Sequence, residues 1–219
     1  MNTKNFTEIT KETLEEEVGK SKALNIWKKY NVRKKPPEKP ALVLMAGYPL
    51  SGKSTLAQEM ERECPNNTVI VESDKIRTYV AEIEDYKVPK YTIHESLLTF
   101  NICHELIRIG LSNSVNVIFD ATNLQEQSRF GSYLAAEEYD APIAVVLVEA
   151  PIEIMTERFE ASDTLRKKAL LKLSETNFTK VTGKRTLIKV NSSHDPYTML
   201  QAIKGLLPIK VMDETMLEK

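Results

Sequence analysis

The sequence predicts an α/β domain with three layers, in which helices cover both faces of a mostly parallel, five-stranded sheet. Short apolar runs alternate along the chain with helix-compatible segments, as expected when parallel strands are joined by helices. A glycine-bearing loop follows the first of these runs, and open parallel sheets bind ligands at the carboxyl ends of their strands. The five predicted strands are 41–46, 68–71, 115–120, 143–148 and 186–190.

Composition is that of one sizeable globular domain. The 219 residues are 42% hydrophobic and 28% charged, with a net charge of −1. This charge excludes a general polyelectrolyte binder, so any nucleic-acid contact requires a local basic surface. No apolar run approaches the roughly 18 residues of a membrane helix, and the polar N-terminus lacks the apolar centre of a signal peptide. With only two cysteines, Cys64 and Cys103, we expect reduced thiols, a cytoplasmic location and no membrane association.

The first predicted strand leads into a loop that matches the pattern G-x-x-x-x-G-K-[ST]. Gly47 and Gly52 permit backbone angles and close approaches that side chains would forbid. The loop then directs backbone N–H groups inward, and the following helix adds its positive N-terminal end, so that a triphosphate can be held. Lys53 is expected to reach the β- and γ-phosphates, and the hydroxyl of Ser54 to bind Mg²⁺. The predicted nucleotide-binding residues are Gly47, Tyr48, Pro49, Leu50, Ser51, Gly52, Lys53, Ser54 and Thr55.

The second predicted strand ends at a pair of charged residues. Asp74 and Arg77 are three residues apart, so they share a face in the first turn of a helix. Asp74 could accept a proton from a hydroxyl, and Arg77 could hold a phosphate or another anion. The alternative is a helix-capping aspartate with a local ion pair.

After a charged connection at residues 82–91, the sequence predicts a long helix from Thr92 to Ile109 that ends at Gly110. The two histidines on it, His94 and His104, have no acidic or cysteine cluster around them. We therefore interpret both as surface or hydrogen-bonded histidines rather than metal ligands.

The third predicted strand ends in Asp120, which fits a Walker B pattern. This carboxylate is expected beside Ser54, where it would hold Mg²⁺ directly or through water. Ala121, Thr122 and Asn123 follow, and then a helix that carries Arg129.

A long basic segment follows the fourth strand. Residues 152–178 are interpreted as helical and as placed to close over a triphosphate, with Arg158 and Arg166 among the cations. Such cations would stabilise charge on a transferring phosphoryl group, although a solvated helix face would have the same composition. Residues 191–193 end the fifth strand where an adenine edge is expected, and a final helix is predicted for residues 197–207.

The main domain is predicted at residues 41–210. A helical extension (residues 1–32), a Pro/Lys-rich linker (33–40) and a polar tail (211–219) flank it. The extension is interpreted either as a helix packed on the domain or as an arm that binds a protein partner or covers substrate.

Three stretches together resemble the ATP-dependent P-loop kinases of the polynucleotide 5′-kinase and zeta-toxin type, a group that also contains small-molecule kinases. They are GYPLSGKS (47–54), SDKIR (73–77) and VIFDATNLQEQSR (117–129). The resemblance covers about Leu42 to Ser193. It implies that Lys53, Ser54 and the loop amides hold ATP and Mg²⁺.

The resemblance also implies roles at the acceptor side. Asp74 is then the general base, and Arg77 grips a phosphate that flanks the acceptor hydroxyl. Asp120 is the Walker B acid, Thr122 and Asn123 line the site, and Arg129 either touches substrate or has a structural role. Arg158 and Arg166 are the candidates for the lid arginine. The chain departs from the pattern at Ser162, where such kinases often carry a second arginine.

We therefore expect an ATP- and Mg²⁺-dependent kinase that transfers the γ-phosphate to a hydroxyl. The acceptor is either a polynucleotide 5′-hydroxyl or a small metabolite or nucleotide. The alternative is a non-catalytic ATP-binding module that engages a protein partner.

Overall fold

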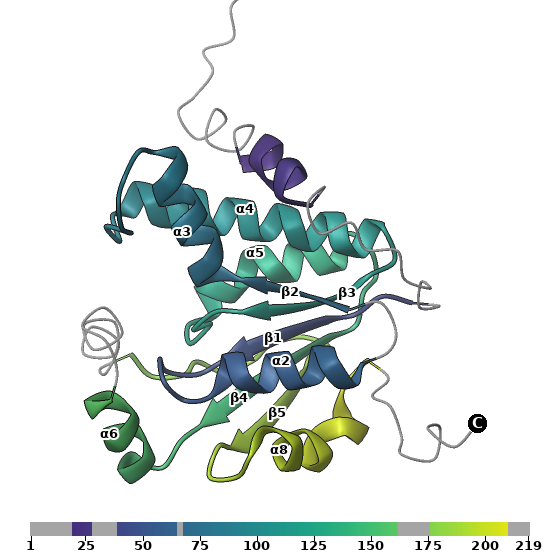
Figure 1. Ribbon diagram of the computed structural model, residues 1–219. Coiled ribbons are helices and arrows are strands. Elements are labelled where there is room, and N and C mark those ends of the chain that lie inside the picture. Colours follow the sequence, from purple (N-terminus) through teal and green to yellow (C-terminus); the bar gives the residue numbers. More distant parts are fainter. Residues whose placement is uncertain (1–18, 28–38, 65–67, 162–175, 210–219) are drawn as a thin grey trace, which may run out of the picture.

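The computed structural model describes residues 19–27, 39–64, 68–161 and 176–209 (Figure 1). Five strands form one sheet in the order β2-β3-β1-β4-β5, and every neighbouring pair is parallel. The strands are β1 (Leu42–Ala46), β2 (Thr68–Glu72), β3 (Asn116–Asp120), β4 (Ile143–Glu149) and β5 (Thr186–Asn191). The predicted α/β fold is confirmed, and the sheet is entirely parallel.

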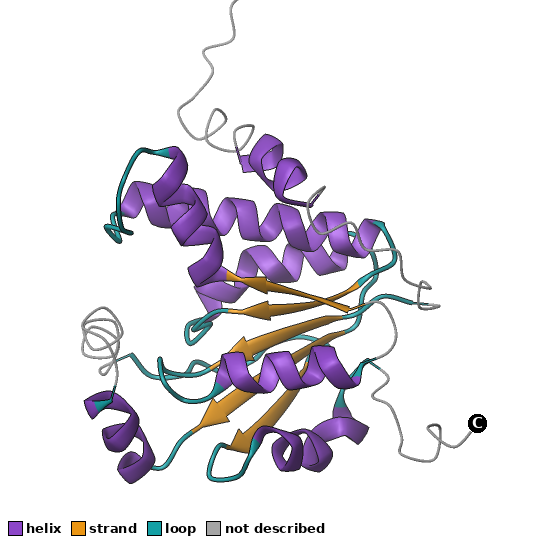
Figure 2. Ribbon diagram, viewed as in Figure 1, coloured by secondary structure: helices purple, strands orange, loops and turns teal. Residues whose placement is uncertain are grey.

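Helices cover both faces of the sheet (Figures 1 and 2). The helices are α2 (Lys53–Glu63), α3 (Ser73–Ile83), α4 (Ile93–Ser112), α5 (Glu126–Glu137), α6 (Ile152–Glu160) and α8 (Pro196–Ile203), with a 3-10 turn η1 (Lys204–Leu206). One layer contains α3, α4 and α5, and the other contains α2 and α8. Residues 19–27 are also helical, and they lie on the side of α4 that faces away from the sheet.

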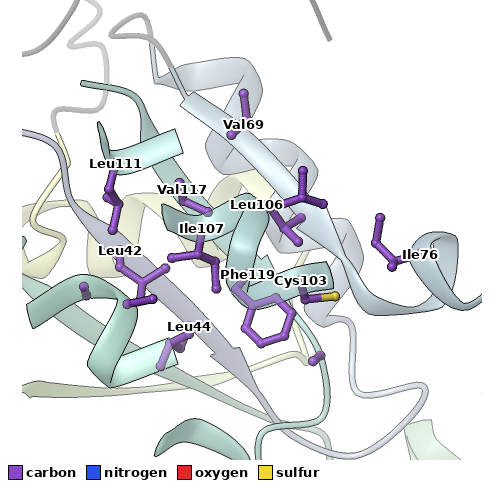
Figure 3. Packing of buried hydrophobic residues seen from close by; sticks show 14 of the residues in the cluster. Leu42, Leu44, Val69, Ile76, Cys103, Leu106, Ile107, Leu111, Val117 and Phe119 are labelled. Atoms are coloured by element: carbon purple, nitrogen blue, oxygen red, sulfur yellow. The ribbon is translucent and has the colours of Figure 1, made fainter. Parts of the chain in front are cut away.

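The central strand β1 divides its side chains between two hydrophobic cores. Leu42 and Leu44 pack with Phe119 of β3 and with residues of α4 such as Ile107 (Figure 3). Val43 and Met45 point to the opposite face and join the core under α2 and α8. Because successive side chains of a strand alternate between faces, the apolar run of β1 is buried on both sides.

Strand register brings three strand ends together. Asp120, the last residue of β3, pairs in register with Met45 of β1 and with Glu72 of β2. The loop after β1, the start of α3 and the end of β3 therefore lie next to each other at the carboxyl edge of the sheet.

The prediction that Gly110 ends the long helix was wrong. Helix α4 continues through Gly110 to Ser112. A Cβ atom on Gly110 would lie 2.6 Å from Cγ2 of Val117 and 3.8 Å from the ring of Trp27. The glycine thus allows close packing of α4 between β3 and the N-terminal helix, and it is not a stop signal.

The helix predicted for residues 152–178 was wrong at its end. Helix α6 ends at Glu160, and residues 176–180 have no helical structure. The amide of Thr179 instead donates a hydrogen bond of 2.9 Å to the carbonyl of Leu124. Residues 162–175, including Arg166, lie outside the described residues. So do residues 1–18 and 28–38 of the predicted extension and linker, and residues 210–219, which include the predicted tail.

Within the described parts of the chain, no helix has the length and apolar character needed to cross a bilayer. Cys64 and Cys103 are free and buried.

Candidate active site

The loop after β1 has the backbone that its glycines allow. Gly47 and Gly52 have φ values of 139° and 97°, and Leu50 between them has 68°. A Cβ atom on Gly47 would lie 2.5 Å from the carbonyl oxygen of Val148. A side chain at Gly47 would therefore push the loop away from the end of β4.

Helix α2 begins at this loop with its first N–H groups uncapped by a side chain. Gly52 is the N-cap residue, no side-chain cap is formed, and the first turn contains no acidic residue. A helix N-terminus of this kind attracts anions through its backbone N–H groups and its dipole. The backbone of the loop and of α2 therefore fits a phosphate group.

Lys53 is buried at the base of this loop. Its Nζ atom donates a hydrogen bond of 2.6 Å to the carbonyl oxygen of Tyr48. Burial lowers the pKa of Lys53, and the negative charges of Asp120 and Asp74 partly offset this effect. The lysine is thus held inside the loop, within the electrostatic influence of both carboxylates.

Asp120 lies beside Ser54, as the sequence predicts. The hydroxyl of Ser54 donates a hydrogen bond to the Asp120 carboxylate. Burial raises the pKa of Asp120, whereas the bond from Ser54 and the charge of Lys53 act in the opposite direction. A hydroxyl and a carboxylate oxygen are hard ligands that fit Mg²⁺, which is typically bound through one or two carboxylates together with substrate phosphates.

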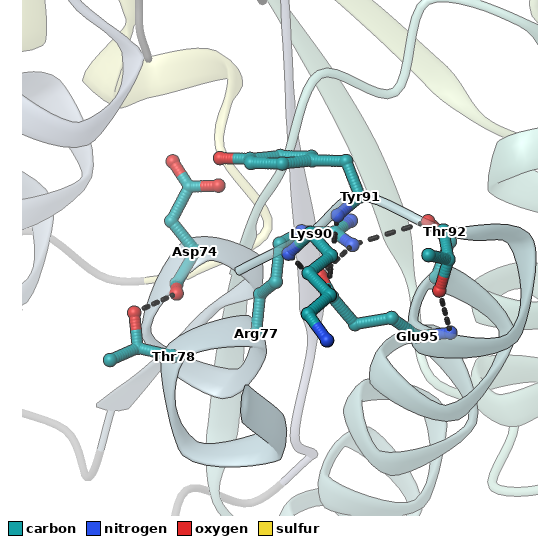
Figure 4. A network of polar contacts seen from close by, with 8 residues as sticks. Asp74, Arg77, Thr78, Lys90, Tyr91, Thr92 and Glu95 are labelled. Atoms are coloured by element: carbon teal, nitrogen blue, oxygen red, sulfur yellow. Dashed lines mark hydrogen bonds and ion pairs between the residues drawn. The ribbon is translucent and has the colours of Figure 1, made fainter. Parts of the chain in front are cut away.

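Asp74 lies in the first turn of α3, next to the end of β2. Its side chain is exposed, and its backbone carbonyl accepts a hydrogen bond of 3.0 Å from the hydroxyl of Thr78 (Figure 4). Its charge acts on both Lys53 and Asp120. The structure thus brings Asp74 to the Lys53 and Asp120 side of the sheet edge, where a γ-phosphate would lie.

Arg77 is buried against α4. Its Nη1 atom donates hydrogen bonds to Oε1 of Glu95 at 3.0 Å and to Oγ of Ser96 at 3.2 Å. The guanidinium carbon lies 4.7 Å from the centre of the Tyr91 ring, and its Nε atom is buried without a partner in the described residues. Arg77 is therefore fixed close to Asp74, with part of its hydrogen-bonding capacity unused.

Arg158 of α6 reaches the nucleotide loop. Its Nη1 atom donates to the carbonyl of Leu50 at 2.9 Å and to Oγ of Ser192 at 3.3 Å. Ser192 follows β5, where the sequence suggests an adenine edge. Arg158 thus links the loop to the end of β5.

Thr122 and Asn123 connect the end of β3 to β1 and the loop. The amide of Gly47 donates to the carbonyl of Thr122 at 3.0 Å. Nδ2 of Asn123 donates to the carbonyl of Met45 at 2.8 Å, and Asn123 has a left-handed φ of 44°. Both residues therefore border the site and also hold its loop in place.

Arg129 is completely buried and holds two separate segments of the chain together. It donates to the carbonyls of Asn123 and Leu124 at 2.7 and 2.9 Å, and to the carbonyl of Thr179 at 2.8 Å. Its Nε atom donates to the hydroxyl of Tyr133. The sequence left two roles open for Arg129, contact with substrate or a structural role, and these contacts are of the structural kind.

Sequence reasoning missed two residues that shape the site, Glu95 and Tyr91. The signal for Glu95 was available, because Thr92 and Glu95 form the T-x-x-E pattern of a capping box. The hydroxyl of Thr92 does accept the Glu95 amide at 3.1 Å. Nothing local predicted that the Glu95 carboxylate would meet Arg77.

Comparisons with known proteins give this chain a family and several relatives. A family model described as "AAA domain" matches residues 42–170. The L-seryl-tRNA(Sec) kinase of Methanococcus maripaludis is 27% identical over 120 residues, which are 53% of this chain and 44% of that protein. The chain thus spans less than half the length of this curated relative.

Two solved structures show the same fold. An unliganded sugar kinase from Janibacter sp. HTCC2649 has a TM-score of 0.59 at 16% identity, over 78% of this chain and 95% of that one. A chain of the Pnkp1/Rnl/Hen1 complex has a TM-score of 0.51 at 24% identity, over 71% of this chain and 48% of that one. The fold of this chain is therefore shared with both of these structures.

Proposed function

The chain belongs to the AAA domain family matched by its residues 42–170, and from this premise we propose that it is an ATP- and Mg²⁺-dependent kinase that phosphorylates a hydroxyl group. The observation that carries the proposal is the grouping of Lys53, Asp120 and Asp74 at one edge of the sheet. A protein that only binds nucleotide needs the first two residues. It has no evident need for a third, exposed carboxylate whose charge reaches both.

Each residue has a part in the proposed reaction. The loop amides and the N-terminus of α2 bind the triphosphate, and Lys53 leaves the Tyr48 carbonyl to bind the β- and γ-phosphates. Ser54 and Asp120 hold Mg²⁺, which supplies charge neutralisation at the phosphates.

The transfer itself balances without a further reactant. The acceptor oxygen forms a bond to the γ-phosphorus while the bond from that phosphorus to the β–γ bridging oxygen breaks. ADP leaves, and the hydroxyl proton passes to the Asp74 carboxylate. Arg77 and Arg158 add positive charge near the two ends of the site, and the fixed geometry supplies orientation.

The acceptor is either a polynucleotide 5′-hydroxyl or a small metabolite or nucleotide. The family resemblance and the similarity to L-seryl-tRNA(Sec) kinase support a hydroxyl that is attached to a nucleic acid. The fold shared with the sugar kinase is compatible with a small acceptor as well.

The test is phosphate transfer from γ-labelled ATP with Mg²⁺ to a panel of acceptors. The panel contains 5′-hydroxyl RNA and DNA oligonucleotides, nucleosides and sugars. We expect label on one acceptor class, loss of that label in Asp120→Asn, and retention in Asp140→Asn, since Asp140 is exposed in the turn before β4. ATP binding without label on any acceptor would contradict the proposal and favour the non-catalytic module.

A further inference from the structure

Tyr91 has an unusual backbone at the acceptor side of the site. It lies in the connection between α3 and α4, has a φ of 56°, and leaves 40% of its surface exposed. A bulky residue in the left-handed region is strained, and such strain persists only where the surroundings impose it. A large ring in this conformation at the sheet edge therefore requires an explanation.

Glu95 imposes this conformation. Its side chain is 1% exposed, and its Oε2 atom accepts the amides of Lys90 at 2.6 Å and Tyr91 at 3.2 Å. Its Oε1 atom accepts Nη1 of Arg77 at 3.0 Å. One buried carboxylate thus fixes both the backbone of Tyr91 and the guanidinium of Arg77.

The ring is placed by these contacts beside the residue proposed to act as the base. One face lies over Arg77, with 4.7 Å between the guanidinium carbon and the ring centre. Figure 4 shows the hydroxyl end of the ring directed toward the Asp74 carboxylate. Tyr91 therefore forms a rigid, partly exposed aromatic surface between Arg77 and Asp74.

We propose that Tyr91 is a specificity-determining residue that stacks against a planar ring carried next to the acceptor hydroxyl, as a nucleobase is in a nucleotide. The inference rests on the proposed function and refines its acceptor. Stacking of a base on an aromatic side chain is favourable and depends little on which base is present. A saturated sugar has no aromatic face for ring-on-ring stacking, so the ring favours acceptors that carry a base. Glu95 is the positioning residue that holds this surface.

The experiment measures binding separately from phosphate transfer. The probe is a 5′-hydroxyl RNA trinucleotide with a 3′ dye, with the protein saturated with Mg²⁺ and a non-hydrolysable ATP analogue. A second probe has an abasic 5′ residue and is otherwise identical. Fluorescence anisotropy gives Kd for wild type, Tyr91→Gly and Tyr91→Phe.

Glycine adopts the left-handed conformation without strain, so Tyr91→Gly removes the ring without threatening the fold. Tyr139→Ala is the control, since Tyr139 is a tyrosine of similar exposure (37%) beyond α5.

We expect Tyr91→Gly to raise Kd for the base-bearing probe by about tenfold or more. Its Kd for the abasic probe should change less than about twofold, and Tyr91→Phe and Tyr139→Ala should bind both probes as wild type does. Equal loss for both probes, a Tyr91→Phe that behaves like Tyr91→Gly, or no preference of wild type for the base-bearing probe would overturn the inference. If binding depends on Tyr91 but no acceptor is labelled in the transfer assay, the kinase proposal fails and the stacking role stands.

Discussion

Arg129 donates hydrogen bonds to both the carbonyl and the hydroxyl of Thr179, at 2.8 and 3.2 Å, across fifty residues of chain. Its guanidinium carbon also lies 4.8 Å from the ring centre of Phe178. The arginine is fully buried, and within the described residues its nitrogens donate to neutral oxygens. It therefore joins the loop after β3 to the segment before β5.

This arrangement predicts that Arg129→Gln acts through stability. The substitution leaves several buried carbonyl groups without donors, so the free energy of unfolding should fall by about 2–4 kcal/mol. Urea denaturation measures the change. Arg108→Gln is the matched control, because Arg108 pairs with Glu138 at a partly exposed site and should change stability little. A variant that is as stable as wild type but does not transfer phosphate would assign Arg129 to substrate binding instead.

Gly110→Ala should destabilise the domain by about 1–3 kcal/mol, because the added methyl group overlaps Cγ2 of Val117. Val117 is buried and β-branched, so it cannot rotate away easily. Gly205→Ala is the control, since a Cβ atom there meets nothing within 4 Å. Thermal unfolding of both variants compares the two sites. Equal melting temperatures would show that α4 does not need the close approach.

Removing the charge of Glu95 should cost about 3 kcal/mol of stability, because Arg77 would remain buried without its ionic partner. Glu95→Gln is the variant, and denaturant unfolding is the measurement. The comparison is Glu59→Gln, which removes the partner of the exposed Arg62 and should have little effect. Two similar losses would mean that the Arg77–Glu95 pair is no more important than a surface pair.

His104 predicts a loss of stability in acid. Burial, aided by the charge of Arg108, lowers the pKa of His104 to about 4, whereas the unfolded chain has a pKa of about 6.5. As the pH falls, the unfolded state therefore binds the proton before the folded state does. The free energy of unfolding is independent of His104 titration above about pH 6.5, and it decreases as the pH falls toward 4, by up to about 3 kcal/mol.

The check is the stability of His104→Gln and wild type from pH 7 to pH 4.5. The difference between the two proteins should narrow or reverse in favour of the variant as the pH falls. The exposed His194 provides the control variant His194→Gln, which should follow wild type. Parallel pH profiles of wild type and His104→Gln would contradict a neutral His104 in the folded protein.

The sheet could be predicted from sequence because its strands are short, apolar runs buried on both faces, as in β1 and β4. The backbone of the glycine-bearing loop was also predictable, since its glycines stand at a fixed spacing directly after an apolar strand. The position of Asp120 was predictable because it ends a neighbouring apolar strand. Asp74 was predicted at the correct strand end, because the carboxyl ends of neighbouring parallel strands meet at one edge.

Features that depend on distant partners were not predictable. Gly110 has the local pattern of a helix end, but its packing against Val117 and Trp27 keeps it inside α4. Phe178 continues a helical pattern, yet its neighbour Thr179 binds Leu124 and Arg129. The meeting of Arg77 and Glu95 likewise depends on how α3 packs against α4.

The most direct test of the account is single-turnover phosphate transfer by Asp74→Asn. Asparagine keeps the size of the side chain and removes its capacity to take a proton, so ATP binding should be unchanged while the transfer rate falls by about 10²-fold or more. Asp140→Asn should transfer phosphate as wild type does. An Asp74→Asn variant that binds ATP and transfers phosphate at the wild-type rate would contradict the role of Asp74 as the base.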